Sequence, residues 1–489
     1  MARGYRHSVL TLIPLCATMN TKLSGNGVTC VAEDKIQSKG VVAVVISAAF
    51  LLTFNQFLLI TAFPTIMEEF NINATEVQWL TNAFILTTII FIPMSGYLST
   101  NFSSKTLVIF SLSCLLLGTA VGGWSPTFGV LIASRVIQAI SAGIILPLIQ
   151  TILLIVFPYN RRGFAMGLLG AVTNIAPASA PSISGIIIDY LDWRSLHWVL
   201  LPFIAITFIL ALLLMKDVLE QNKSKLDIRS VILSAIGFSS FIYGLSNISV
   251  YGFLGPLSLI PMLIGILGIL FFSSRQFKIA TPVMNLELFR NRTFTLAIIL
   301  IFINMMLLLS TETILPMFAQ DALGTSAFLS GFLLVPGTVI LSVMTFISGN
   351  LYDRYGGKRI AMIGFSFTAI SLILLNTVSM MDSPYWIMAH FCLFMAGFGL
   401  TLMPLVTVSM SELGGRDIPH GSAIVNTVRQ FAMAFGIIIL TSIISITVSV
   451  VDAPYNEGTY LGTSYALAVM AALAIFGLSL TFLLKEPRQ

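Results

Sequence analysis

Long apolar runs recur along the chain from Val41 to Leu484, and short polar stretches separate them. Many of these runs approach the ~20 residues that cross a bilayer as a helix. The breaks between the runs predict about fourteen spanning helices, with ends defined to within several residues. The predicted spans are Val41–Met67, Gln78–Leu98, Thr106–Trp124, Phe128–Val156, Gly163–Ile188, Leu196–Met215, Val231–Ile248, Leu254–Phe272, Phe294–Phe318, Phe328–Gly349, Ile360–Met380, Tyr385–Met410, Ala423–Val450 and Ser464–Leu484.

Composition supports a membrane location. The chain has 489 residues, of which 57% are hydrophobic and only 9% are charged, whereas soluble domains carry about 25% charged residues. We therefore predict an all-α polytopic membrane protein. The net charge of +5 does not suggest a nucleic-acid partner. Cys16, Cys30, Cys114 and Cys392 form no CxxC pair, so neither a disulfide framework nor a metal site is indicated.

Charged residues alternate between successive loops, as expected when cytoplasmic loops are enriched in lysine and arginine. With the N-terminus inside, the predicted inner loops carry Lys105, Arg161, Arg162, Lys216, Lys223, Lys225, Arg275, Lys278, Arg290, Arg292, Arg354, Lys358, Arg359 and Arg416. The predicted outer loops carry Glu68, Glu69, Glu76, Asp189, Asp192, Asp321, Asp382, Asp452 and Glu457, with Arg194 as their one basic residue. This alternation predicts an even number of spans and two cytoplasmic termini.

The first forty residues differ from the rest. Arg3 and Arg6 precede the short apolar run "VLTLIPLCATM", which resembles a signal-peptide core but is too short to span a membrane. We interpret residues 1–40 as a disordered cytoplasmic tail, or as the product of a translation start placed too far upstream.

Two predicted inner loops resemble each other. "GYLSTNFSSK" runs from Gly96 to Lys105 and "GNLYDRYGGK" from Gly349 to Lys358. Each follows the second helix of a six-helix block, covering residues 41–215 and 293–489, if the linker 216–292 contributes two additional helices. Such repeats are typical of secondary transporters, which place the substrate site between the two halves. The alternative is that turns with glycine and lysine recur by chance.

The second loop closely resembles the signature loop of the major facilitator superfamily. The resemblance implies two six-helix bundles plus two extra central helices. It also implies that Gly349, Asp353, Arg354 and Lys358 latch the cytoplasmic ends of neighbouring helices. In the first loop Gly96 and Lys105 match, but Thr100 stands where aspartate is usual, which implies a weaker latch.

The fourth span, "LIASRVIQAISAG", contains Arg135 and, one turn later, Gln138. An arginine inside the membrane costs ~2.5 kcal/mol or more, so it should face protein or water. The alternative is an arginine that snorkels to the headgroups. The stretch resembles a family motif whose arginine is linked to proton transfer or to the substrate cavity.

The fifth span contains "GAVTNIAPASAPSISG", from Gly170 to Gly185. Pro177 and Pro181 interrupt the helical hydrogen bonds, and the small residues permit close helix contact. Ordinary small-residue packing could explain either residue type alone. The combination resembles the antiporter motif of drug exporters, which implies export rather than import.

The thirteenth span begins "HGSAIVNTVRQFAMAFG", in which Asn426, Arg429 and Gln430 share one helical face. Snorkelling is an alternative for Arg429. The string resembles the fourteen-span drug:proton antiporter branch (EmrB/QacA type), which implies a bacterial cytoplasmic membrane. In the first span Asn55 occupies a position where that branch commonly has aspartate. Asparagine can hydrogen-bond a substrate, but it cannot carry a proton.

Of the 20 acidic residues only Glu312 lies well inside a predicted span. Desolvation penalises the charged form of a carboxylate, so Glu312 is the best candidate for a proton carrier. Asn304, about two turns away, would join it at the substrate cavity. Two alternatives are a static partner for Arg135 or Arg429, and a residue near the outer mouth with little role.

These features predict a proton-driven exporter, acting as a monomer without cofactor, for hydrophobic or cationic drug-like molecules. The 36 Phe and 21 Met residues suit varied ligands. A dedicated exporter of one metabolite, antibiotic or lipid-like molecule is the alternative within transport, and a transport-inactive receptor is another class. An enzyme is not expected, because no nucleophile–base pair, metal-ligand set or Walker motif occurs.

Overall fold

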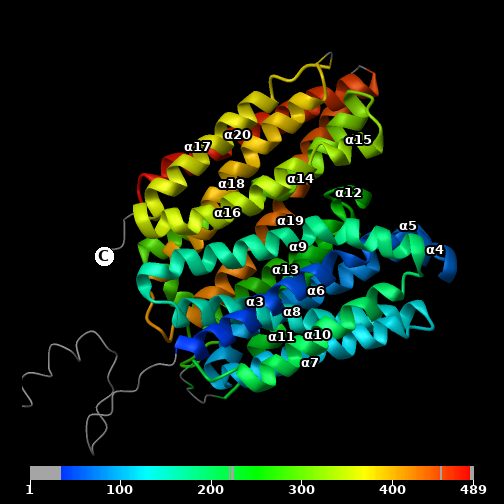
Figure 1. The fold of residues 1–489 in the computed structure, drawn as a ribbon. Coiled ribbons are helices and arrows are strands. Elements are labelled where there is room, and N and C mark those ends of the chain that lie inside the picture. The colour runs from blue at the N-terminus through cyan, green and yellow to red at the C-terminus, as the bar shows by residue number, and fades with distance from the viewer. Residues whose placement is uncertain (1–34, 220, 222–224, 381, 452–453, 485–489) are drawn as a thin grey trace, which may run out of the picture.

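The structure is a computed structural model that describes residues 35–219, 221, 225–380, 382–451 and 454–484. Within these residues all regular structure is helical, and fourteen helices are long and apolar enough to cross a membrane. They form two lobes. The N-terminal part of the chain, coloured blue to green, forms the first lobe, and the C-terminal part, coloured yellow-green to red, forms the second (Figure 1). The all-α fold expected from the sequence is confirmed.

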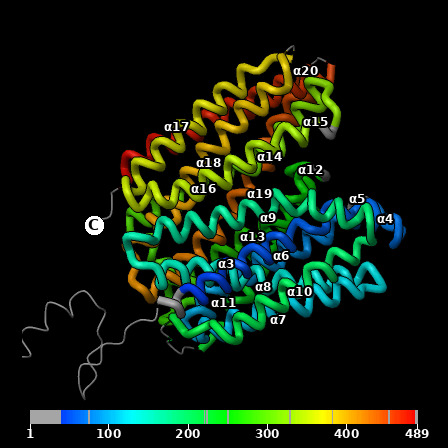
Figure 2. Tube along the Cα trace, viewed as in Figure 1, coloured from blue at the N-terminus to red at the C-terminus, as the bar shows by residue number. Residues whose placement is uncertain are grey.

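The first bundle contains six of the fourteen spans, and the second bundle contains another six. The elements of the first are α3 (Lys35–Leu58), α4 (Phe63–Phe70), α5 (Ala74–Val77), α6 (Trp79–Asn101), α7 (Ser104–Gly123), α8 (Phe128–Val156), α9 (Arg162–Tyr190) and α10 (Ser195–Leu214). Those of the second are α14 (Arg292–Met317), α15 (Ala327–Phe332), α16 (Val335–Tyr355), α17 (Gly357–Leu375), α18 (Tyr385–Ser411), α19 (Ile418–Val450) and α20 (Tyr455–Thr481). The tube in Figure 2 traces the same order.

The two remaining spans are α11 (Ile228–Ser246) and α13 (Pro256–Gln276), joined through the short α12 (Ile248–Tyr251). The pair packs tightly because glycines face each other: a Cβ on Gly268 would lie 2.7 Å from the Cα of Gly237. The α11 helix contacts both α6 and α19. Its Phe238 and Phe241 rings lie 5.2 and 5.5 Å from the ring of Phe431 on α19. The hairpin therefore lies along the seam where the two bundles meet.

Prolines divide two spans that the sequence predicted as continuous. The predicted span Val41–Met67 ends as α3 at Leu58 and resumes as α4, with Pro64 in its first turn. The predicted span Phe328–Gly349 is likewise divided between α15 and α16, with Pro336 in the first turn of α16. A proline has no N–H to donate, so the carbonyl four residues earlier loses its helical partner, whereas the proline itself fits the first turn of the next helix.

The N-terminal prediction lies mostly outside the described residues. Residues 1–34 are not described, whereas residues 35–40 already belong to α3. The helical start therefore precedes the predicted boundary at residue 40.

Charge distinguishes the two ends of the bundle. We call the end with the Lys105, Arg161, Arg354 and Arg416 loops the basic end, and the opposite one the acidic end. In Figure 1 the two lobes lie closest on the side of the C-terminus and diverge toward α4, α5 and α15.

Glycines allow the bundles to meet closely at the basic end. A Cβ on Gly349 of α16 would lie 2.3 Å from the carbonyl oxygen of Gly163 on α9. A Cβ on Gly167 would lie 2.9 Å from the Cα of Gly349. The α9–α16 junction is thus one seam between the bundles, and the α6–α19 junction is the other. At the α6–α19 seam, a Cβ on Gly96 would lie 3.0 Å from His420 Nδ1. Side chains at these positions would hold the bundles apart.

We expect Gly349→Ala to destabilise the protein by about 1–3 kcal/mol, because the added methyl group overpacks a contact with backbone atoms. Gly185→Ala is the matched control, since a Cβ at Gly185 meets no atom within 4 Å. The control should be neutral or slightly stabilising, because alanine favours helix more than glycine does. Thermal unfolding of both variants in detergent micelles measures the difference. Equal melting temperatures would contradict this account of the seam.

Candidate functional site

A cavity of about 500 Å³ lies between the two bundles. Its wall contains residues of α3, α6, α8 and α9 from the first bundle and of α14, α16, α18 and α19 from the second. The volume is within the range of pockets that hold drug-sized ligands. The cavity is therefore the candidate functional site, and both halves of the chain contribute to it.

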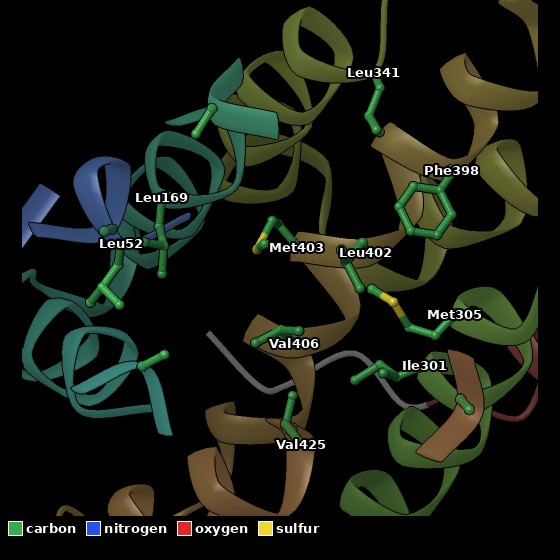
Figure 3. Close-up of a cluster of buried hydrophobic side chains, with 14 of the residues drawn as sticks. Leu52, Leu169, Ile301, Met305, Leu341, Phe398, Leu402, Met403, Val406 and Val425 are labelled. Atoms are coloured by element: carbon green, nitrogen blue, oxygen red, sulfur yellow. The ribbon is translucent and has the colours of Figure 1, made fainter. Parts of the chain in front are cut away.

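Apolar side chains supply much of the wall. Leu169 of α9 faces the cavity from the first bundle, and Met403 and Val406 of α18 face it from the second. Figure 3 shows Met403 and Val406 extending from α18 toward the side on which Leu169 lies. Leu402 extends the other way, toward Met305 of α14, inside the second bundle (Figure 3). Flexible methionine and leucine side chains can adapt to ligands of different shape.

Neutral amide side chains add polar points to the wall. Gln56, Gln150 and Asn174 belong to the first bundle, and Asn426 and Gln430 belong to the second. The first three amides were not predicted from the sequence. Each is an amide within an apolar span, and this feature can be detected in the sequence. A span that is hydrophobic on all sides has no helical periodicity, however, so the sequence did not indicate which face of the helix meets the cavity.

Hydrogen bonds between the bundles cluster on the basic side of the cavity. Asn426 Nδ2 donates to Gln150 Oε1 at 3.0 Å, and Thr151 Oγ1 lies 3.1 Å from Ser422 Oγ. Asn174 Nδ2 donates to Thr345 Oγ1 at 3.1 Å. Together with the glycine contacts, these bonds close the cavity toward the basic end.

Glu312 and Arg429 are the charged residues of the wall, on α14 and α19 of the second bundle. Each is partly buried, and in the described structure neither has a hydrogen bond or an ion pair with another residue. Pro316 follows Glu312 by four residues, so the carbonyl of Glu312 lacks its usual helical donor. A static partnership of Glu312 with Arg135 or Arg429 would require an ion pair between them. No such ion pair is present among the described residues.

Arg135 lies behind the cavity wall and is only 2% exposed. Its Nε donates to Leu80 O at 3.3 Å, and its Nη2 donates to Gln56 O at 3.0 Å. Its Nη1 donates to Asn55 O at 3.1 Å, to Asn55 Oδ1 at 3.3 Å and to Gln138 Oε1 at 3.0 Å. The guanidinium thereby ties α8 to α3 and α6, and it does not extend to a lipid headgroup.

Three residues that the sequence assigned to the substrate cavity lie away from its wall. Asn55 and Gln138 are fully buried partners of Arg135, and Gln138 also donates to Thr119 Oγ1 at 3.3 Å. Asn304 is buried inside the second bundle, where its Nδ2 donates to Thr401 Oγ1 at 2.7 Å. Buried amides need partners within the protein. Asn55 and Gln138 find them in neighbouring helices, whereas Asn304 bonds through its Nδ2 and its Oδ1 has no partner among the described residues.

The second signature loop joins the two bundles directly. The carboxylate of Asp353, at the end of α16, accepts hydrogen bonds from Gly163 N and Phe164 N, both at 2.8 Å. These N–H groups belong to the first turn of α9, so Asp353 caps a helix of the other bundle.

The remaining residues of that loop complete the turn. Arg354 stacks on the Tyr355 ring at 5.1 Å, and Lys358 Nζ donates to Phe482 O at 2.7 Å. Gly356 ends α16 with a φ of 81°, a left-handed conformation that favours glycine.

The first signature loop lacks the corresponding carboxylate. Thr100 Oγ1 donates to Tyr97 O of its own helix at 2.9 Å. The following helix is instead bound to the linker after α10, because Val218 N donates to Ser104 Oγ at 3.0 Å and Lys105 N donates to Asp217 Oδ1 at 3.1 Å. The first signature loop therefore makes contacts beside its own bundle, whereas the second signature loop joins the two bundles.

The fifth-span motif residues differ in what surrounds them. A Cβ on Gly170 would lie 2.5 Å from Thr345 Cγ2 and 2.7 Å from Met403 Cγ, so this glycine lets the bundles approach beside the cavity. Pro177 lines the cavity. Pro181 does not line it, and Gly185 has open space where a Cβ would be.

His197, near the start of α10, is a buried polar residue that the sequence analysis did not identify. It is 1% exposed, and both of its ring nitrogens are without a hydrogen-bond partner among the described residues. Its ring packs on Gly122 of α7 and edge-on to Trp193. A single histidine at the end of an apolar span gave no pattern to detect.

Metal-binding clusters of three or more His, Cys, Asp or Glu are absent from the described part of the chain. Cys114 and Cys392 are free cysteines.

Comparisons with known proteins agree with this geometry. The sequence profile described as the Major Facilitator Superfamily matches residues 45–437, and the chain belongs to this family. YcnB, an MFS-type transporter of Bacillus subtilis (strain 168), is 37% identical over 462 residues, covering 94% of this chain and 98% of YcnB. The lincomycin resistance protein LmrB of the same organism is 34% identical over 470 residues, covering 94% of this chain and 98% of LmrB.

A solved structure shows the same fold. The crystal structure of the human organic anion transporter MFSD10 matches with a TM-score of 0.66 at 14% identity, covering 91% of this chain and 99% of that chain. The protein is thus a multi-pass membrane transporter and not an enzyme.

We expect Asp353→Ala to destabilise the closed seam by about 0.5–2 kcal/mol, the usual cost of losing a helix N-cap. Thr100→Ala changes the equivalent position of the first loop, which bonds only within its own helix, and should have a smaller effect. Disulfide formation between cysteines placed at the basic ends of α9 and α16 reports how often the seam is closed. A closed fraction equally affected by the two substitutions would contradict the capping role.

Proposed function

We propose that this transporter exports amphipathic small molecules across the bacterial cytoplasmic membrane in exchange for protons, by alternating access of the central cavity. The observation that carries the proposal is the cavity between the two bundles, with Glu312 as its acidic wall residue. The bundles supply matching halves of the wall, as alternating access requires.

The direction of transport follows from orientation and family resemblance. Lysine- and arginine-rich loops favour the cytoplasm, so the basic end and both termini are assigned to that side. The seams are then closed toward the cytoplasm by the glycine contacts and the Asp353 cap. This arrangement corresponds to the state that releases substrate outward, and the fifth-span motif favours export.

Glu312 is the proposed proton carrier. Its carboxylate is on the cavity wall without a hydrogen-bond partner in the described structure, so no contact within the protein fixes it in one protonation state. Arg135 was predicted to share this role. Its five hydrogen bonds to α3, α6 and α8 favour a positioning role instead, because they hold Asn55 and the cavity-facing part of α3 in place.

The relatives support a drug-like substrate. LmrB is named for lincomycin resistance and matches this chain over nearly its whole length. The wall combines apolar side chains with scattered amides, which suits amphipathic molecules of varied shape. A panel of unrelated dyes and antibiotics would separate a multidrug exporter from an exporter dedicated to one compound.

We expect Glu312→Gln to abolish dye efflux driven by a pH gradient in proteoliposomes, because glutamine cannot carry a proton. Exchange of labelled for unlabelled dye across the same membranes should continue, since it needs no net proton movement. Glu457→Gln is the control, because this acid is exposed at the start of α20. Gradient-driven efflux that persists in Glu312→Gln with an unchanged pH dependence would refute the assignment.

A further inference from the structure

Arg135 and Arg429 both lie well inside their spanning helices, and their surroundings differ. Arg135 makes five hydrogen bonds to oxygen atoms of neighbouring residues. Arg429 lies on the cavity wall and makes none, nor any ion pair, among the residues that the structure describes. Arginine stays charged in proteins, so it cannot escape the cost of burial by losing a proton. The donors of Arg429 are thus open to whatever occupies the cavity.

We propose that the cavity is built for amphoteric molecules, whose anionic or strongly accepting group binds Arg429 while their protonated amine binds Glu312. This inference rests on the proposed function, because it concerns the molecules that pass through the cavity. It names a narrower substrate class than cationic or hydrophobic drugs.

The cost of desolvation supports a ligand acceptor at Arg429. A ligand that fills the cavity displaces water from the guanidinium, and a charge without water or a partner is strongly unfavourable. A carboxylate or comparable acceptor on the ligand would replace that water with charge-assisted, geometrically matched hydrogen bonds. A purely cationic ligand would leave Arg429 unpaired and add repulsion.

The opposite charge on the same wall supports an amine. Glu312 is on α14, which packs against α19, the helix that carries Arg429. No ion pair joins the two side chains, so a ligand does not have to break one in order to bind both. Binding of an ammonium group also favours the deprotonated carboxylate, which links amine binding to proton release.

The facing wall is neutral. Gln56 and Asn174 of the first bundle contribute amides, which accept and donate hydrogen bonds without preferring either charge. The charge preference of the cavity therefore arises on the second bundle, where one group of each sign is available.

Three probes built on one scaffold test the inference. The first is an amphoteric compound with a free amine and a free carboxylate, the second is its methyl ester, and the third is its N-acetyl derivative. Binding to purified protein in detergent is measured by calorimetry, which does not depend on proton coupling. For the wild type we expect the amphoteric probe to bind about tenfold or more tightly than either derivative.

Substitutions of Arg429 test whether this arginine causes the preference for the probe's carboxylate. Arg429→Gln should weaken binding of the amphoteric probe and retain or strengthen binding of its cationic ester, because the repulsion between the ester and Arg429 is removed. Measurable ester binding also shows that the variant is folded. Arg429→Lys keeps the charge and should retain part of the preference. Arg292→Gln, which changes an exposed arginine at the start of α14, is the control and should have no effect.

The outcomes separate this inference from the proposed function. Equal binding of the three probes by the wild type, no binding of any probe, or an equal loss for all probes in Arg429→Gln would overturn the amphoteric preference. Export of the ester that is driven by a pH gradient would still support proton-coupled efflux. Failure of gradient-driven export for all substrates would count against the proposed function itself.

Discussion

Polar groups buried in a membrane bundle must find their partners within the protein, because hydrocarbon offers none. Most of this structure follows that constraint. Arg135 uses all three guanidinium nitrogens on oxygens of α3, α6 and its own helix α8, and Asn304 bonds to Thr401 in the neighbouring helix. Glu312 and Arg429 have no such partner in the described structure, and both line the cavity instead of facing lipid or packed side chains. The cavity wall therefore holds charge that the protein itself does not pair.

The fold could be read largely from the sequence, because the length of each apolar run is sufficient to place a spanning helix. The interruptions within spans were less accessible: Pro64 and Pro336 lie in the first turn of α4 and α16, after a short break in the span, whereas Pro177 and Pro316 lie inside continuous helices. A proline inside a span is tolerated when neighbouring groups satisfy the freed carbonyl, and that depends on tertiary packing.

The site was only partly predictable. Glu312, Asn426 and Arg429 do line the cavity, and the signal was a charged or amide side chain within an apolar run. The same signal placed Asn55 and Gln138 there, although both are held by Arg135 behind the wall. Helices that are apolar on every side have no periodicity to show which face is inward, so the distinction requires the packed structure.

The α11–α13 hairpin makes the two seams unequal. Along one seam, between α6 and α19, protein covers the junction through Phe238 and Phe241. Along the other, between α9 and α16, Ile175, Val343 and other apolar side chains are exposed. The transporter therefore has a front and a back in the plane of the membrane. In the proposed alternating access, one flank would slide against lipid and the other against a part of its own chain.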